Sequence, residues 1–256
     1  MNMLGNKYLN LLREITLAQF KLKDQSTFFG YVWSFLNPLL MLAVLFAFFR
    51  LRIGGEIEHY AIYLLLGIIH YTHFSNSTTA ALRVLYSMKH LTCNAVFPKE
   101  LLVMGSILAS FVEFAISLFI CTVIAFFAGV DIRWSLFMLP LVILLQGLLV
   151  FWISLLLSGL YVFIRDIDHI YQVFLRLLFF LTPIFYSLSF LGQDMARHIV
   201  LANPLTYLIG FSRAIVIEGR LFSVHLFLLF LLVNIVLIYC SFRVFKRIEP
   251  RFAENL

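Results

Sequence analysis

The sequence has 256 residues, of which 62% are hydrophobic and only 12% are charged, and its mean hydropathy is +0.99. An ordinary soluble domain is about half apolar and about a quarter charged, so this composition excludes a soluble protein and predicts an integral membrane protein. The formal net charge of +6 is typical of cytoplasmic loops beside anionic lipid, and no nucleic-acid-binding motif accompanies it. We therefore expect membrane lipid, and no nucleic acid, among the partners of the chain.

Residues 1–28 predict an amphipathic helix that lies on the membrane surface. Their apolar side chains recur at helical spacing, while charged and amide side chains occupy the opposite side. These apolar positions are Leu4, Tyr8, Leu11, Leu12, Ile15 and Leu22. Such a helix acts either as a plain lipid anchor or as a collar that leads into the first membrane span. Lys7, Arg13 and Glu14 interrupt the apolar run, so the segment does not resemble a secretory signal peptide.

Six stretches of about 20 mainly apolar residues follow, which is the length that a helix needs to cross a bilayer. They cover residues 29–49, 60–82, 101–128, 135–164, 171–190 and 222–242. Placing both termini in the cytoplasm leaves most Lys and Arg residues on the cytoplasmic side, as the positive-inside rule requires. We expect a single all-α domain, with a six-span bundle over residues 29–242 and a cytoplasmic tail over residues 243–256.

A further apolar stretch, residues 199–217, contains the pair Asn203-Pro204 and Arg213. A full span here would put Arg213 inside the membrane and would move the basic C-terminal tail to the outside. Pro204 has no N–H to donate and disfavours a helical Asn203, so the helix is expected to break there. We expect residues 191–221 to form a re-entrant helical pair between spans five and six. Asn203, Pro204 and Arg213 would then gate a cavity or, alternatively, brace span five against span six.

Residues suited to catalysis or metal binding are sparse in this sequence. Glu113 is the only acid deep inside a predicted span, where it serves either a function or a hydrogen bond to a neighbouring helix. His70 and His73 share a helical face with several hydroxyl residues, which favours a polar interhelical surface over a metal site. No Walker A phosphate loop is present. We expect no catalytic residue, no metal and no cofactor in this chain, so that, if it pumps a substrate, a partner supplies the energy.

Four separated segments resemble one family, the transmembrane (permease) subunits of ATP-binding-cassette exporters of polysaccharides such as O-antigen, capsule and teichoic acid. The segments are TFFGYVWSFLNPL at residues 27–39, NAVFPKE at 94–100, FIRDI at 163–167 with FFLTPIFY at 179–186, and NPL at 203–205 followed by Arg213 and Gly219. In the first segment, Phe29 replaces the family's usual Leu. The segments occur in the family's order and extend over most of the chain.

The resemblance implies a homodimer of six-span subunits in a bacterial cytoplasmic (inner) membrane. Two cytoplasmic ATP-binding-cassette ATPase subunits, which bind ATP and Mg, are expected beneath it. It also implies that residues 89–98, within a cytoplasmic coupling loop over residues 83–100, press on the ATPase as a coupling helix. The expected ATPase-coupling residues are Lys89, Asn94, Phe97, Pro98, Lys99, Arg165 and Asp166. A plain surface connection is the alternative interpretation of the loop.

Aromatic residues make up 17% of the chain, more than interfacial anchoring requires. The apolar face of a sugar ring packs on aromatic rings without a fixed hydroxyl pattern, so such rings suit a sliding lipid-linked polysaccharide. The expected conduit residues are Trp33, Phe35, Phe46, Phe49, Tyr63, Phe179, Phe180 and Tyr186. Two alternatives remain open: a permease for a smaller cargo such as a drug or lipid, and a membrane-embedded glycolipid-processing enzyme.

Overall fold

The computed structural model describes residues 2–24, 32–51, 57–95, 97–131, 133–188 and 195–256, and within them the chain is built from helices. The long helices are α1 (Asn2–Asp24), α2 (Val32–Phe49), α3 (Tyr60–Ser87), α5 (Glu100–Phe127), α6 (Leu139–Phe163), α7 (Ile167–Leu181) and α10 (Val224–Ile248). The shorter ones are α4 (Lys89–Asn94), η2 (Trp134–Met138), α8 (Met195–Ala202), α9 (Pro204–Val216), η3 (Glu249–Arg251) and α11 (Phe252–Asn255). The all-α prediction is confirmed.

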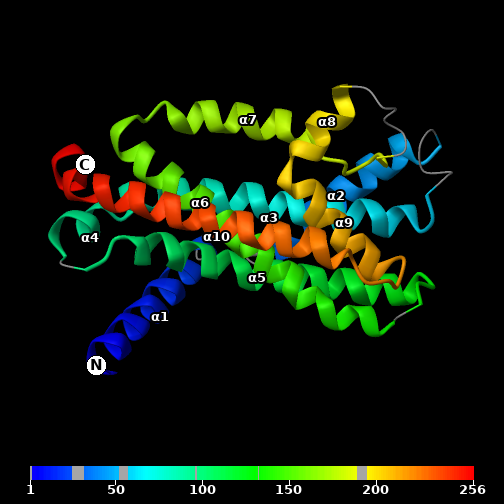
Figure 1. The fold of residues 1–256 in the computed structure, drawn as a ribbon, viewed down its shortest axis with the longest axis horizontal. Helices are drawn as coiled ribbons and strands as arrows, with labels where there is room; N and C mark the ends of the chain where they lie inside the picture. Colours follow the sequence, from blue (N-terminus) through cyan, green and yellow to red (C-terminus); the bar gives the residue numbers. More distant parts are fainter. Residues whose placement is uncertain (1, 25–31, 52–56, 96, 132, 189–194) are drawn as a thin grey trace.

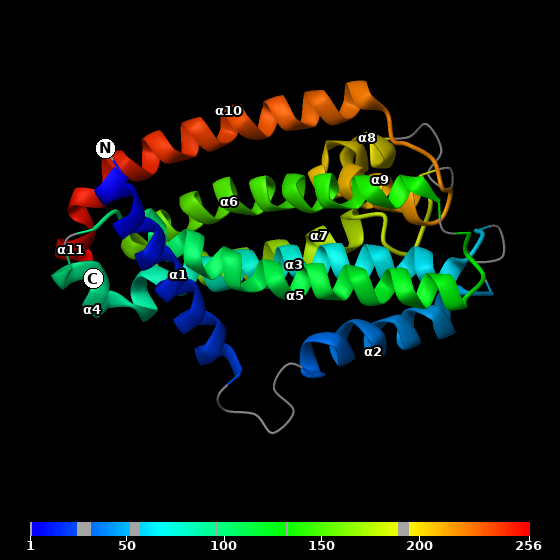
Figure 2. The same ribbon diagram turned by 90° about the horizontal axis from the view of Figure 1, so that it is seen from below.

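Long helices run back and forth along one axis, with α3 in the middle of the bundle (Figures 1 and 2). α3 packs mainly against α5 and α6, and most of its side chains are buried. The N-terminus, α4 and the C-terminus lie at one end of the bundle, which we call the α4 end (Figure 1). α8 and α9 lie at the opposite end, which we call the α9 end.

Three described helical segments are long and apolar enough to cross a membrane: Glu100–Phe127, Trp134–Phe163 and Val224–Asn255. A fourth is obtained if the bent pair α8–α9 forms one span. The apolar part of α2 is shorter, and α3, although 28 residues long, carries many polar side chains. Length and composition therefore support three or four spans in the described part of the chain, fewer than the six expected.

The fifth expected span, residues 171–190, differs most from the structure. Its helix, α7, begins at Ile167 and ends at Leu181, and Thr182 is already extended. Pro183 accounts for this end, because proline disfavours a helical residue before it and cannot donate to the helix. The apolar sequence continues beyond the helix, so hydropathy alone placed this boundary too late.

Helix α1 packs against α5 and crosses it at an angle (Figure 2). Ile15, which is 5% exposed, sits over Gly105, where an added Cβ would lie 2.5 Å from the Ile15 Cγ2 atom. Part of the apolar face of α1 is thus used by the bundle itself. α1 ends at Asp24, and the last residues of the expected 1–28 segment lie outside the described part of the chain.

Residues 243–256, the expected cytoplasmic tail, are mostly helical. α10 continues without a break to Ile248, and η3 and α11 follow it directly. The side chain of Phe252 in α11 is only 1% exposed. The last residues of the chain are therefore part of the folded α4 end.

Helices α8 and α9 meet at Asn203 and enclose a bend of 81°. Asn203 has extended backbone angles, and its side-chain oxygen accepts a hydrogen bond from the N–H of Leu205 at 3.0 Å, which caps α9. Pro204 occupies the first turn of α9, where its missing N–H costs nothing. The predicted break at Asn203-Pro204 is confirmed. α9 is largely buried, whereas Val200 is the buried residue of α8.

Candidate transport and coupling sites

Arg213 lies on the buried face of α9 and is 7% exposed. Its guanidinium donates to three backbone carbonyl oxygens: those of Tyr63 at 3.0 Å, Pro183 at 2.8 Å and Ile184 at 2.9 Å. The guanidinium carbon also lies 3.3 Å from the centroid of the Tyr63 ring. Carbonyl oxygens and an aromatic face both stabilise a buried cation. Arg213 therefore ties α9 to α3 and to the segment that follows α7.

Gly67 on α3 makes this arrangement possible. An added Cβ at this position would lie 3.1 Å from the Arg213 Nη2 atom and 3.1 Å from the Cα atom of Ile184. Both distances are shorter than ordinary van der Waals contacts. Sequence reasoning missed Gly67, since a lone glycine in an apolar helix carries no specific signal.

A second contact joins the bend of the α8–α9 pair to the end of α7. The side-chain nitrogen of Asn203 donates to the Thr182 hydroxyl at 2.8 Å and to the Leu181 carbonyl at 3.4 Å. The Thr182 hydroxyl in turn donates to the Leu178 carbonyl at 2.6 Å. Thr182 is completely buried. The expected gate residues Asn203 and Arg213 thus hold the same segment, residues 182–184, from two sides.

Next to this segment, aromatic side chains from α2, α3, α7 and the chain after α7 gather into one group, which we call the aromatic cluster. Its members are Phe46, Phe49, Tyr60, Tyr63, Tyr71, Phe179, Phe180, Phe185 and Tyr186. The closest stacked pair is Phe49 and Phe185, with ring centroids 4.7 Å apart. Most of the expected conduit residues therefore lie together, and sequence reasoning missed Tyr60, Tyr71 and Phe185.

Trp33, an expected conduit residue, lies apart from the aromatic cluster. Trp33 lies at the opposite end of α2 from Phe46 and Phe49 and is 45% exposed. The side chain of Phe35 lies outside the described part of the chain. Their inclusion rested on a resemblance in the 27–39 segment, which predicts a helix entry but not the direction of each side chain.

Tyrosine hydroxyls in the aromatic cluster bond to the backbone around the end of α7. Tyr60 donates to the Phe185 carbonyl and Tyr63 to the Tyr186 carbonyl, each at 2.9 Å. Tyr71 donates to a carbonyl within α7, that of Leu175. These hydroxyls fix the positions of the three rings relative to α7 and the segment that follows it.

An open pocket of about 310 Å³ lies beside the aromatic cluster at the end of α2. Phe46, Arg50, His59 and Tyr60 are among its lining residues. Arg50 lies over the Phe46 ring, with its guanidinium carbon 5.1 Å from the ring centroid. The pocket therefore combines aromatic walls with a cationic group.

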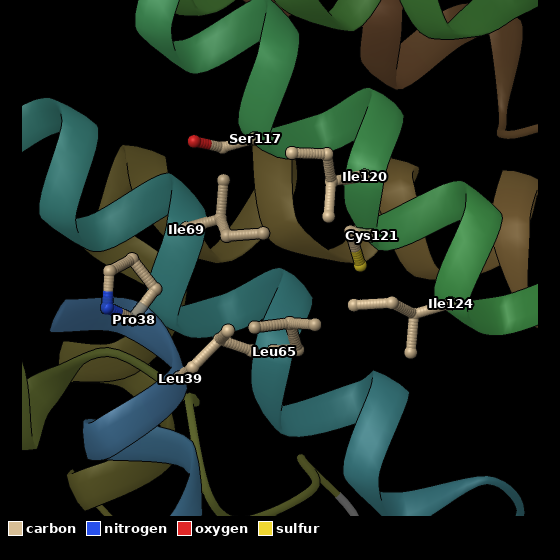
Figure 3. A pocket seen from close by; sticks show the side chains of 8 residues that line it. All are labelled: Pro38, Leu39, Leu65, Ile69, Ser117, Ile120, Cys121 and Ile124. Atoms are coloured by element: carbon tan, nitrogen blue, oxygen red, sulfur yellow. The ribbon is translucent and has the colours of Figure 1, made fainter. Parts of the chain in front are cut away.

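A second, much smaller gap of about 20 Å³ lies between α2, α3 and α5 (Figure 3). Pro38 of α2 and Leu65 and Ile69 of α3 face Ile120 and Cys121 of α5 across it. A volume of this size holds about one water molecule, and its lining is almost entirely apolar. It is a packing gap and too small for a sugar.

Four polar side chains form a buried network in the middle of the bundle. The His70 ring bonds to the Gln146 side-chain oxygen and, at 2.7 Å, to the Ser212 hydroxyl. The Gln146 amide nitrogen donates to the His70 carbonyl at 2.8 Å and contacts His73 Nδ1 at 3.0 Å. Because Gln146 offers His70 an acceptor oxygen, His70 Nδ1 carries the proton, and Nε2 accepts from Ser212. The polar surface expected at His70 and His73 thus joins α3 to α6 and α9.

Metal binding finds no support in this network. Within the described residues, no group of three or more His, Cys, Asp and Glu side chains has a geometry suited to a metal ion.

At the α4 end, the structure brings the expected coupling residues together. Lys89 and Asn94 begin and end α4, and both are exposed. The Lys99 ammonium lies 4.5 Å from the Phe97 ring centroid and donates to the carbonyl of Ala95. Partial burial lowers the pKa of Lys99 from its ordinary value, and the nearby carboxylate of Glu249 opposes this shift.

The remaining expected coupling residues lie where α6 gives way to α7. The Arg165 guanidinium carbon is 3.9 Å from the centroid of the Tyr86 ring at the end of α3, and Asp166 directly precedes α7. Sequence reasoning missed a bidentate ion pair beside them, in which Arg83 donates to the two Asp168 oxygens at 3.0 and 2.9 Å. Arg–carboxylate pairs of this geometry fix orientation as well as charge. The loop between α6 and α7 is thus attached to the end of α3.

Sequence comparison connects these features with known proteins. The family described as ABC-2 type transporter matches residues 10–217. The O-antigen export system permease protein RfbA of Myxococcus xanthus is 27% identical over 251 residues, which are 98% of this chain and 96% of that protein. Two proteins of the same name from Klebsiella pneumoniae are each 26% identical over 249 residues, 96% of this chain and 95% of theirs. A glycolipid-processing enzyme is excluded, and the chain belongs to the ABC-2 type transporter family as a membrane transport subunit.

Proposed function

We propose that this chain is the membrane-spanning subunit of an ATP-driven exporter that moves lipid-linked, O-antigen-like polysaccharide across the bacterial cytoplasmic membrane. The observation that carries the proposal is the end-to-end similarity to O-antigen export permeases from two organisms. The aromatic cluster supports it physically. Ring faces that bind many sugars weakly allow a polymer to slide, whereas a pocket of fixed hydrogen bonds would hold one unit in place.

The energy for transport comes from two cytoplasmic ATP-binding-cassette ATPase subunits, which bind ATP and Mg. The sequence of this chain has no Walker A phosphate loop, which agrees with the binding of ATP by a separate subunit. Helix α4 is the contact through which the ATPase acts, because it projects at the end of the bundle beside exposed Lys89 and Asn94. Lys99 holds the end of α4, because its ammonium donates to the carbonyls of Leu91 and Ala95.

The membrane topology has six spans, formed by α2, α3, α5, α6, α7 and α10, with both termini in the cytoplasm. Alternating helix directions support this count, since the two termini and α4 share one end of the bundle and α8–α9 lies at the other (Figure 1). α3 crosses the membrane in spite of its polar side chains because its neighbours bury them. α1 lies at the cytoplasmic membrane surface, and α8–α9 enters and leaves the membrane from the far side.

A second copy of the chain completes the conduit. α2 and α7 both expose apolar side chains, including Phe48 at 73%, Leu177 at 60% and Phe180 at 65%. In a homodimer that joins these faces, Phe180 and the adjoining aromatic cluster of each copy would border the space between the two subunits. The polymer passes there, and the other exposed apolar faces meet lipid.

The α8–α9 pair closes this path when no polymer is present. Asn203 and Arg213 hold residues 182–184, which directly precede the rings of Phe185 and Tyr186, and Arg213 also donates to the Tyr63 carbonyl of α3. A displacement at the bend beside Pro204 would release that segment and widen the path. The alternative role, a static brace, predicts that Pro204→Gly with Arg213→Ala leaves the ion conductance of the resting transporter unchanged, whereas a gate predicts a rise.

Docking of the ATPase is tested with a thiol that the chain already carries. Cys93 on α4 is exposed, and Cys240→Ser removes the other exposed thiol, so a maleimide reports on α4. We expect Cys93 to react in the free chain and to be protected in the complex with the ATPase. Equal reactivity in both samples would contradict docking at α4.

The cargo is tested by export of labelled polymer from cells or vesicles. Phe179→Ala in the aromatic cluster should lower polysaccharide export, and Phe127→Ala, an 82% exposed ring on α5, is the matched control. A normal polymer flux in Phe179→Ala would contradict an aromatic conduit. Stimulation of ATP hydrolysis by a small drug or lipid, with none by polymer, would favour the smaller-cargo alternative.

A further inference from the structure

The last residues of the chain connect three helices at the α4 end. Phe252 of α11 packs on Phe245 of α10, with ring centroids 5.3 Å apart, and on Phe163 at the end of α6, 6.0 Å away. Phe245 is fully buried and Phe252 is 1% exposed. α11 also contacts α4 and α6. The C-terminal residues therefore do not trail from the bundle but join α10, α6 and α4.

A charged contact reinforces this connection. Lys246 on α10 donates to the Glu100 carboxylate at 2.8 Å and to the Glu249 carboxylate at 2.9 Å. The other oxygen of Glu249 accepts the backbone N–H of Lys99 at 3.0 Å. Lys99 directly precedes α5, so Glu249 supplies an acceptor at the N-terminus of that helix, where a negative charge is favourable.

Both carboxylates of this contact are shielded from water, with the Glu100 side chain 16% exposed and the Glu249 side chain 19% exposed. Charge-assisted hydrogen bonds in such surroundings are stronger and better oriented than exposed ion pairs. The start of α5 and the end of α10 are consequently held in one geometry.

We propose that residues 245–256 form a clasp that carries a displacement of α4 into α10 and α6, so that the C-terminal segment is part of the coupling apparatus. The inference rests on the proposed docking of the ATPase at α4. Without the clasp, a force on α4 passes along the chain only to α3 and α5, which flank it in the sequence. With it, the same force moves α10, because energetic coupling follows packed side chains and hydrogen-bond networks.

Helix α10 connects the α4 end with the α8–α9 pair. α10 runs the length of the bundle from the α9 end to the α4 end, and it begins shortly after the bent pair (Figure 2). The turn before it, at Gly219, has a positive φ of 62°. α10 also packs on α9 through two aromatic pairs, Tyr207 with Phe230 and Phe211 with Phe227, whose ring centroids lie 6.2 and 6.4 Å apart. A movement of α10 would therefore act on α9.

Glu249 is the positioning residue whose loss tests the clasp. Glu249→Ala removes both of its contacts, whereas Glu249→Gln keeps an acceptor for the Lys99 N–H and loses the ionic contact with Lys246. Glu254→Ala, at an exposed acid in α11, is the matched control for the loss of one negative charge. Each variant is purified as the full complex with the ATPase, and polymer exported per ATP hydrolysed is measured alongside ATPase recovery.

We expect Glu249→Ala to assemble and to hydrolyse ATP while polymer exported per ATP falls by about two- to thirty-fold, the range for disruption of a coupling network. Glu249→Gln should be intermediate, and Glu254→Ala should match the wild type. If Glu249→Ala fails to assemble, the Gln variant carries the measurement.

If polymer exported per ATP hydrolysed is unchanged in the Glu249 variant that assembles, the proposed clasp is wrong. The same holds if export and ATP hydrolysis fall by the same factor. A wild-type chain that recruits no ATPase would instead refute the proposed function, so the two failures are distinguishable.

Discussion

Replacement of Arg213 by Met or Lys tests the contact between α9 and the segment of residues 182–184. Met has a similar length but donates no hydrogen bond, so Arg213→Met leaves the carbonyls of Tyr63, Pro183 and Ile184 without this donor. Lys keeps the charge, but its compact ammonium lacks the planar fork that reaches several carbonyls at once.

The expected cost follows from these three carbonyl contacts. Hydrogen bonds to a charged group contribute about 1.5–3 kcal/mol each, which gives a gross loss of about 5–9 kcal/mol for Arg213→Met. The substitution also removes the cost of burying a cation, which is several kcal/mol. We expect a net loss of about 2–4 kcal/mol, equivalent to a fall in Tm of roughly 5–15 °C for a chain of this size. Arg213→Lys should lose about half as much, since one ammonium keeps part of the carbonyl contacts.

Thermal unfolding of the purified transporter in detergent measures the stability, and single-channel recording in planar bilayers measures the leak. Arg213→Met should unfold at a lower temperature and conduct ions at rest. Arg176→Met, at an exposed arginine on α7, is the control for the loss of one positive charge. The reasoning is refuted if Arg213→Met melts and conducts like Arg176→Met.

Three further predictions follow from the described contacts. Gly105→Ala should destabilise the docking of α1 by about 1–3 kcal/mol because the added methyl group clashes with Ile15. Ile15→Ala should relieve that clash, so thermal unfolding should show the double variant to be more stable than the sum of the two single effects predicts. Simple additivity would contradict the contact. His70→Ala should lower the Tm because buried polar partners lose their hydrogen bonds at about 1–3 kcal/mol each, and an unchanged Tm would contradict the network. Single cysteines at Met195 and Leu221 in a Cys-free background should both react with an impermeant thiol reagent from the non-cytoplasmic side, and labelling from opposite sides would establish a full span.

Hydropathy was a good guide to helices whose ends coincide with a change in composition. The stretch predicted at 101–128 corresponds to α5 (Glu100–Phe127), because charged residues precede it and glycine follows it. The stretch predicted at 171–190 was wrong at its end, since apolar residues continue past Pro183 into an irregular segment. Apolar sequence reports burial in protein or lipid, and it does not distinguish a helix from a segment packed under other helices.

The candidate site was predictable in part, since aromatic composition predicted most members of the aromatic cluster and charge predicted the surroundings of Arg213. An arginine inside an apolar stretch needs partners, which predicted that Arg213 would face carbonyls or a cavity. Its actual acceptors, at Tyr63, Pro183 and Ile184, are backbone atoms without a sequence signature. Glu249 and its contact with the backbone N–H of Lys99 were missed for a related reason, because the contact joins positions far apart in the chain and only folding brings them together.

The most direct test of the account is ATP hydrolysis by the complex of this chain with its ATPase, reconstituted in proteoliposomes with and without lipid-linked polysaccharide. The account predicts that the ATPase co-purifies with the chain, that polymer stimulates hydrolysis, and that labelled polymer crosses the membrane only when ATP is hydrolysed. Transport of polymer without an ATPase, or a complex that ignores polymer and responds only to a small lipid or drug, would contradict it.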